Sequence, residues 1–125
     1  MAKKRILVID DEYDLGFVIS ACLEEFGTWE VFTVDSGKEG LTLAQTEQPD
    51  AILLDVMMPD MDGITVFHCL KSEPVTQKIP VIFMTAKVQS SDLKQFSSLG
   101  ASGVISKPFD PLKLVDQITE MLQWK

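Results

Sequence analysis

The sequence has few cysteines, few basic residues and no long apolar segment, and each shortage excludes a class of protein. Its two cysteines, Cys22 and Cys69, have neither metal-site nor redox spacing and are interpreted as core residues. Lys and Arg number 11 against 19 Asp and Glu, and the net charge of −8 argues against non-specific binding to nucleic acid or anionic lipid. The apolar run in the opening segment MAKKRILVID is too short for a signal peptide or a membrane span. We therefore expect a cytoplasmic, reduced protein.

The chain also shows no internal boundary. It contains no low-complexity segment, repeat or linker rich in Pro, Gly and Ser. Its 125 residues suit one domain with one well-buried core. We therefore predict a single domain over residues 1–125.

Apolar segments of two periodicities alternate along the sequence. Short apolar runs, typical of strands buried on both faces, occupy residues 5–10, 29–34, 51–55, 79–85 and 103–107. Helical spacing or position in the alternation predicts helices at 15–27, from 35 or 36, from about 63, at 91–100, and at 110–124 with Asp110 as its cap. Five strands alternating with five helices indicate an α/β, doubly wound parallel sheet with helices on both faces.

The candidate functional residues stand where the apolar runs end. In a doubly wound sheet, ligands bind outside the carboxyl ends of the strands. The second run ends at Asp35, which we expect to lie off to one side. The other runs bring a set of polar residues to one rim: Asp10, Asp11, Asp55, Thr85 and Lys107.

Three carboxylates at one rim repel one another unless a cation lies between them. Oxygen ligands at an exposed rim suit Mg²⁺, which keeps several waters. Asp10, Asp11 and Asp55 are the proposed ligands or supports for ligands, and the backbone carbonyl of Met57 is a further candidate oxygen. A metal cofactor, Mg²⁺, is therefore expected.

The remaining two residues suit a tetrahedral oxyanion. Lys107 supplies a positive charge and Thr85 a hydroxyl donor, so a phosphoryl group would fit beside the metal. Asp55 can itself accept that group as a nucleophile, which gives an aspartyl phosphate.

Each of these residues taken alone also has a structural interpretation. Asp11 fits a helix cap, Asp55 an Asx turn, Thr85 a hydroxyl bonded to nearby backbone, and Lys107 a solvated surface lysine. His68, the only histidine, is interpreted as a surface or half-buried residue of a helix. The shared rim, rather than any one residue, favours a site.

Four motifs in this order and spacing, VIDDE, LLDVMMPDMDG, MTA and KPF, resemble the receiver domain of two-component response regulators from about Lys4 to Leu122. The resemblance implies a flavodoxin-like fold of strand order 2-1-3-4-5, as in chemotaxis regulators. It further implies that Asp55 is the phosphoacceptor, that Lys107 and Thr85 contact the phosphoryl oxygens, and that the peptide before Pro108 is cis. The metal ligands implied are Asp10, Asp11, Asp55 and the Met57 carbonyl.

The same resemblance implies the partners and the mode of action. The donor would be a phosphohistidine on a sensor histidine kinase or a histidine phosphotransfer protein. The receiver would be a switch that assists its own phosphorylation and dephosphorylation, not an enzyme. It would change the surface of its fourth helix, fifth strand and fifth helix to control a downstream protein target, without binding nucleic acid or membrane directly. We expect either a stand-alone receiver, which the initial Met1 favours, or one from a longer protein.

The chain departs from the family pattern at position 104. Receivers usually have an aromatic residue there that reorients with the Thr, and this chain has Val104. We expect its output to depend more on movement of the loop and the fourth helix. Positions 57 and 87 tune phosphoryl lifetime in the family, and the bulky apolar Met57 predicts a long-lived phosphoryl group here, beside Lys87.

Other functions fit parts of the pattern. A phosphorylation-independent binding module would need only the fold, but none of the five rim residues is missing. A Mg²⁺-dependent phosphatase of the haloacid-dehalogenase type needs a second Asp two residues after its nucleophile, where this chain has Met57. A flavodoxin needs a phosphate-binding Ser/Thr/Gly loop where Asp10 and Asp11 stand.

Overall fold

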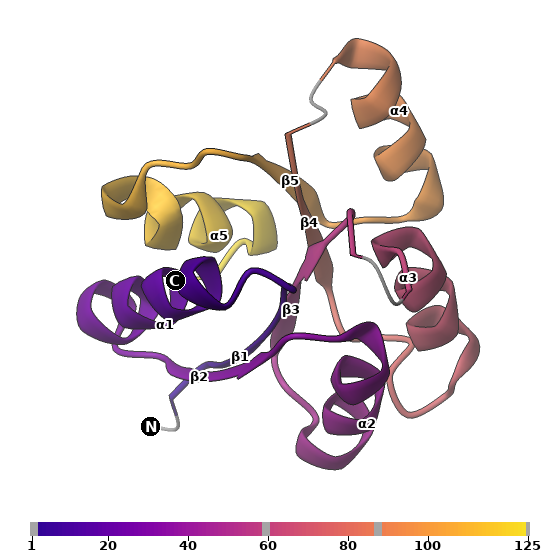
Figure 1. The fold of residues 1–125 in the computed structure, drawn as a ribbon, viewed down its shortest axis with the longest axis horizontal. Coiled ribbons are helices and arrows are strands. Elements are labelled where there is room, and N and C mark those ends of the chain that lie inside the picture. The colour runs from indigo at the N-terminus through magenta and orange to yellow at the C-terminus, as the bar shows by residue number, and fades with distance from the viewer. Residues whose placement is uncertain (1–2, 59–60, 87–88, 125) are drawn as a thin grey trace.

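The computed structural model describes residues 3–58, 61–86 and 89–124, and within them a five-stranded parallel sheet forms the centre of the molecule (Figure 1). The strands lie in the order β2-β1-β3-β4-β5, which confirms the predicted fold class and strand order. Their bounds are β1 Arg5–Ile9, β2 Glu30–Val34, β3 Ala51–Asp55, β4 Val81–Thr85 and β5 Gly103–Ser106.

The helices alternate with the strands as the sequence predicts. Ser36 and Asp62 cap two of them, because their side chains accept the amide protons of Glu39 and Thr65. The bounds are α1 Tyr13–Gly27, α2 Gly37–Glu47, α3 Gly63–Ser72, α4 Ser90–Leu99 and α5 Leu114–Leu122. In the described part of the chain, no helix has both the length and the apolar character to cross a membrane.

The last helix starts differently from its prediction. Asp110 caps a short 3₁₀ turn, Pro111–Lys113, and α5 itself begins only at Leu114. The Lys113 amide donates to the Asp110 carbonyl three residues earlier, at 3.0 Å, which is the tighter 3₁₀ bond. The predicted first helical residue, Pro111, therefore belongs to the 3₁₀ turn and not to the α-helix, whereas the predicted capping role of Asp110 is confirmed.

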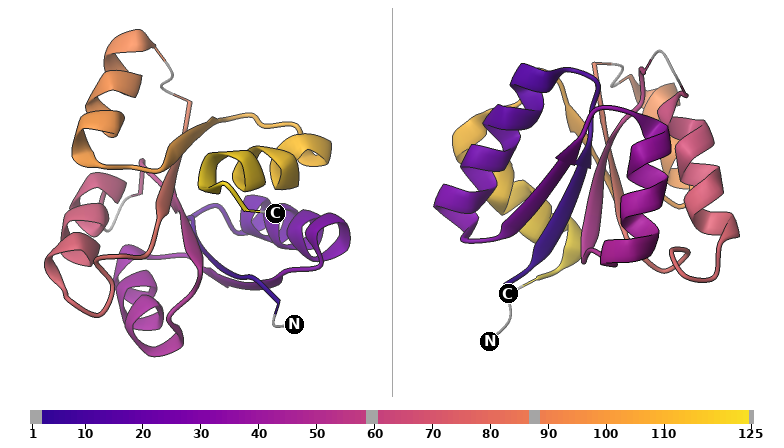
Figure 2. Two further views of the ribbon diagram at one scale, coloured as in Figure 1. Left: turned by 180° about the vertical axis from the view of Figure 1, so that it is seen from behind. Right: turned by 60° about the horizontal axis from the view of Figure 1, so that its bottom comes forward.

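The helices cover both faces of the sheet, and each face has its own core. Helices α1 and α5 pack on one face, and α2, α3 and α4 on the other, as Figure 2 shows from two further directions. Alternate strand residues serve the two cores: Ile6 and Val8 face the first, and Leu7 and Ile9 face the second. This double burial explains why the strands read as continuous apolar runs.

The parallel register brings the carboxyl ends of the central strands to one edge. Ile9 of β1 is level with Leu54 of β3, and Asp55 is level with Met84 of β4. Gly63 lets the start of α3 come close to this edge, because a Cβ there would overlap the carbonyl oxygen of Asp55.

Candidate functional site

Three aspartates meet at the carboxyl edge of the sheet. Asp10 directly follows β1, Asp11 is the next residue, and Asp55 ends β3. Each contributes one carboxylate oxygen to a group in which all three oxygens lie within 4.8 Å of one another. Asp10 is 2% exposed and Asp55 is 3% exposed, whereas Asp11 is more open. The structure thus brings the three predicted carboxylates together.

Lys107, which directly follows β5, reaches into the same cluster. Its Nζ lies 3.0 Å from Asp10 Oδ2 and 3.2 Å from Asp55 Oδ1. The same atom donates to Glu12 Oε1 at 3.2 Å. Burial by itself would lower the pKa of Lys107, but the close contact with Asp10 and the negative charges of Asp10 and Asp55 raise it. Lys107 is therefore a partly buried, fully charged partner of three carboxylates and not a solvated surface lysine.

The Asp55 carboxyl is the most perturbed group of the cluster. Burial, followed by the negative charge of Asp10, raises its pKa from 3.8 to about 7, against the opposing charge of Lys107. Its Oδ1 also accepts the Met57 amide at 3.3 Å, so the Asx-turn interpretation holds together with the site interpretation. A buried carboxylate with this pKa next to a fixed cation is typical of a functional site.

Thr85 lies at the same edge of the sheet, at the end of β4. It is 1% exposed, and its carbonyl accepts the Lys107 amide at 2.9 Å. The Val56 amide donates to the Met84 carbonyl at 3.2 Å, so the segments after β3 and β5 are both tied to the end of β4. Met57, two residues after Asp55, is 60% exposed.

Sequence reasoning missed Glu12. It is the third acid of the VIDDE motif, and its amide donates to Asp10 Oδ1 at 2.9 Å, which places its side chain near Lys107. Glu12, not Asp11, takes the N-cap position of α1, and its side chain makes no capping hydrogen bond. The three-acid run was the available signal. As expected, Asp35 is outside the three-aspartate cluster, although it lines a cavity of about 360 Å³ that Asp10 also borders.

Other predicted residues have simpler positions. His68 is exposed on α3, Cys22 is buried and Cys69 is half-buried. The peptide between Lys107 and Pro108 is cis, as predicted. Lys87 lies outside the described residues.

The charge balance and the donor atoms fit a hard divalent cation. The cluster has more carboxylates than cations, and every ligand atom it offers is oxygen, which suits Mg²⁺ better than a soft metal. Within the described residues, Asp10 Oδ2 is buried and makes no hydrogen bond, with only the Lys107 ion pair to balance its charge. The residues present therefore fit Mg²⁺.

Comparison with known proteins assigns the family. The model of the response regulator receiver domain matches residues 6–119, so the chain belongs to that family. It is 39% identical over 122 residues to the response regulator PleD of Caulobacter vibrioides, covering 97% of this chain and 26% of PleD. It is 37% identical over 120 residues to the alkaline phosphatase synthesis transcriptional regulatory protein PhoP of Bacillus subtilis, covering 96% of this chain and 49% of PhoP. The chain thus spans half or less of the length of these relatives.

A solved structure supports the same family. The chemotaxis response regulator CheY4 of Vibrio cholerae superposes with a TM-score of 0.89 at 27% identity, covering 96% of this chain and 99% of that one. The predicted resemblance to receiver domains of two-component systems is confirmed.

Proposed function

We propose that this chain is a phosphoacceptor switch in which Asp55 takes a phosphoryl group from a phosphohistidine of a partner protein. The observation that carries this proposal is the buried Asp55 carboxylate within 3.2 Å of Lys107 Nζ, inside a three-aspartate cluster. Family membership supports it, because receiver domains are signalling switches that interact with histidine kinases and output targets. We also propose that residues 1–125 act as one domain.

The transfer itself is a substitution at phosphorus. An Asp55 oxygen attacks, the bond from phosphorus to the donor histidine nitrogen breaks, and that nitrogen keeps the electron pair. Asp55 then carries an acyl phosphate. Asp10, Asp11, Asp55 and the Met57 carbonyl would hold Mg²⁺, which supplies charge neutralisation between the carboxylates and the phosphoryl oxygens.

The protein's own groups position and stabilise the phosphoryl group. Lys107, already within 3.2 Å of Asp55, donates to a phosphoryl oxygen. Thr85, buried at the end of the neighbouring strand, donates its hydroxyl to another. Movement of Thr85 toward the new charge shifts the segment that leads to α4 and changes the surface of α4, β5 and α5 for a downstream protein.

Acetyl phosphate tests this proposal because it is a phosphoryl donor that needs no identified kinase. The protein is incubated with acetyl phosphate and Mg²⁺, and its intact mass is measured for the wild type and Asp55→Asn. We expect one phosphoryl adduct on the wild type, lost when a chelator replaces Mg²⁺, and none on Asp55→Asn. Asp35→Asn is the matched control, because Asp35 also follows a strand but lies outside the cluster. An adduct that persists on Asp55→Asn, or is missing from the wild type, would contradict the proposal.

A further inference from the structure

Helix α4 is held to the sheet through one deeply buried side chain. Among α4 residues whose side chains the structure describes, Phe96 alone is buried, at 3% exposed. Leu93 is 41% exposed and Leu99 is half-buried. Figure 1 shows α4 at one end of its helix layer, beyond α3. The position of α4 therefore depends on where the Phe96 ring packs.

Phe96 belongs to a stack of three aromatic rings. Its centroid is 5.0 Å from that of Phe83 on β4, with an angle of 43° between the planes. The Phe83 centroid is in turn 5.3 Å from that of Phe67 on α3. Phe83 and Phe67 are 0% and 1% exposed. Tilted aromatic pairs stabilise a fold by more than the burial of their apolar area alone. The stack therefore joins α4, β4 and α3 as one packed unit.

Strand β4 connects this stack with the candidate site. Phe83 and Thr85 are two residues apart in the strand, so their side chains leave the same face. On β5, Phe83 is level with Val104, which packs against the same core without a ring of its own. Because protein interiors are close-packed, a displacement at Thr85 is passed to neighbouring side chains and not absorbed by empty space.

We propose that Phe96, packed on Phe83, transmits movement of the Thr85 end of β4 to α4, in place of an aromatic side chain at position 104. The inference rests on the proposed phosphorylation of Asp55. Phe96 is a positioning residue here, since its ring reaches the site only through β4.

The experiment compares amide NMR spectra of the free protein with those of protein holding Mg²⁺ and beryllofluoride, a mimic of the aspartyl phosphate. The variants are the wild type, Phe96→Leu, and Phe32→Leu as a control. Phe32 is a partly buried ring packed against the same core but on β2, at the far edge of the sheet. Circular dichroism checks folding, and Phe96→Met replaces Phe96→Leu if the latter unfolds, because Met is an adaptable core residue.

We expect the amides of Thr85 and of α4 to shift together in the wild type and in Phe32→Leu. In Phe96→Leu, the Thr85 shift should remain. The equilibrium constant between the α4 positions of the free and the beryllofluoride-bound protein should change by a factor about 2- to 30-fold smaller than in the wild type. A purely structural role for Phe96 would lower the melting temperature without separating the two shifts. Full α4 shifts in Phe96→Leu, or a shifted Thr85 with unmoved α4 in the wild type, would overturn this inference alone. No shift at Thr85 in the wild type would contradict the proposed function, and the inference with it.

Discussion

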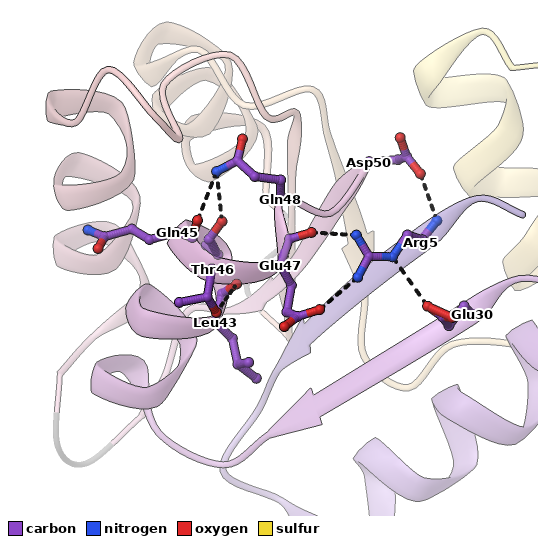
Figure 3. Close-up of polar contacts among 9 residues, drawn as sticks. Arg5, Glu30, Leu43, Gln45, Thr46, Glu47, Gln48 and Asp50 are labelled. Atoms are coloured by element: carbon purple, nitrogen blue, oxygen red, sulfur yellow. Dashed lines mark hydrogen bonds and ion pairs between the residues drawn. The ribbon is translucent and has the colours of Figure 1, made fainter. Parts of the chain in front are cut away.

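Two charged clusters lie at opposite ends of the sheet, and they are built in opposite ways. At the end away from the candidate site, Arg5 joins β1, β2 and the end of α2 (Figure 3). Its guanidinium contacts Glu30 at 3.2 Å and Glu47 at 2.8 Å, and it also donates to the Glu47 carbonyl. The Arg5 amide donates to Asp50 at 2.8 Å. The carboxylates here are partly exposed, and each has a hydrogen-bond donor.

At the other end, Lys107 is a single ammonium group shared by three carboxylates, two of them buried. One buried oxygen, Asp10 Oδ2, has no hydrogen bond among the described residues, and the pKa of Asp55 is raised to about 7. Buried like charges are costly, so this cluster is poor at stabilising the fold. The Arg5 cluster thus holds strands and a helix together, whereas the Lys107 cluster is arranged to bind a cation and an oxyanion.

Removing the cation from each cluster should give the largest difference, measured as the rate at which the phosphoryl adduct forms. We expect Lys107→Met to slow adduct formation from acetyl phosphate by about 100- to 1,000-fold, the usual loss for one group that stabilises developing charge. Arg5→Met, the matched change at the other cluster, should leave this rate unchanged. Time courses of intact mass measure both. Equal rates for Lys107→Met and the wild type would show that the two clusters do not differ in this way.

The next largest effect should be the pH dependence of Mg²⁺ binding to the aspartate cluster. Because protons compete with the metal for Asp55, with a pKa of about 7, Mg²⁺ affinity should rise about tenfold between about pH 6 and about pH 8. Calorimetric titration measures this affinity, and Asp55→Asn should lose most of the dependence. A pH-independent affinity in the wild type would argue against a protonated Asp55.

The free energy of unfolding of the metal-free protein should also depend on protonation of Asp55. The raised pKa means that folded Asp55 binds a proton more tightly than the unfolded chain does. Its contribution to the free energy of unfolding is therefore present below the ordinary value of 3.8 and is lost as the pH rises through about 7. Denaturant titrations in chelator should show this decline in the wild type and not in Asp55→Asn. Arg5 does not contribute to this pH dependence, because the hydrogen bond with Glu30 raises its pKa above an already high value.

The lifetime of the phosphoryl group should respond to Met57. Its side chain, two residues after Asp55, is exposed and offers no hydrogen bond to an attacking water. We expect Met57→Asn to speed hydrolysis about fivefold, since one net hydrogen bond contributes about 1 kcal/mol. Decay of the adduct after removal of acetyl phosphate measures this rate. An unchanged lifetime would contradict a role for Met57 in the lifetime of the phosphoryl group.

The peripheral carboxylates should matter least. Glu12 is 62% exposed in its contact with Lys107, and Glu30 is 50% exposed in its contact with Arg5. We expect Glu12→Gln to change the rate of adduct formation by less than about fivefold, and Glu30→Gln to lower the free energy of unfolding by about 0–1 kcal/mol without changing the rate. A larger rate effect for Glu12→Gln would place it among the essential groups.

The fold and the core of the site could be predicted because both follow from where apolar runs end. Asp10, Asp55 and Thr85 end or directly follow strands, and parallel strands bring such ends to one edge. The three-acid run was an available signal for position 12, but the contact of Glu12 with Lys107 could not be predicted, because it depends on how this side chain leaves the N-cap position of α1. Likewise, the 3₁₀ turn at Pro111–Lys113 depends on a hydrogen bond to Asp110 that apolar spacing does not encode.

The location of the phosphoryl group is the most direct test of the central claim. Borohydride reduces an aspartyl phosphate to homoserine, so treatment of the acetyl-phosphate-labelled protein followed by peptide mass mapping identifies the acceptor. We predict homoserine at position 55 and unmodified aspartate at positions 10, 11 and 35. Homoserine at any of those three positions, with Asp55 unmodified, would contradict the assignment of Asp55 as the phosphoacceptor.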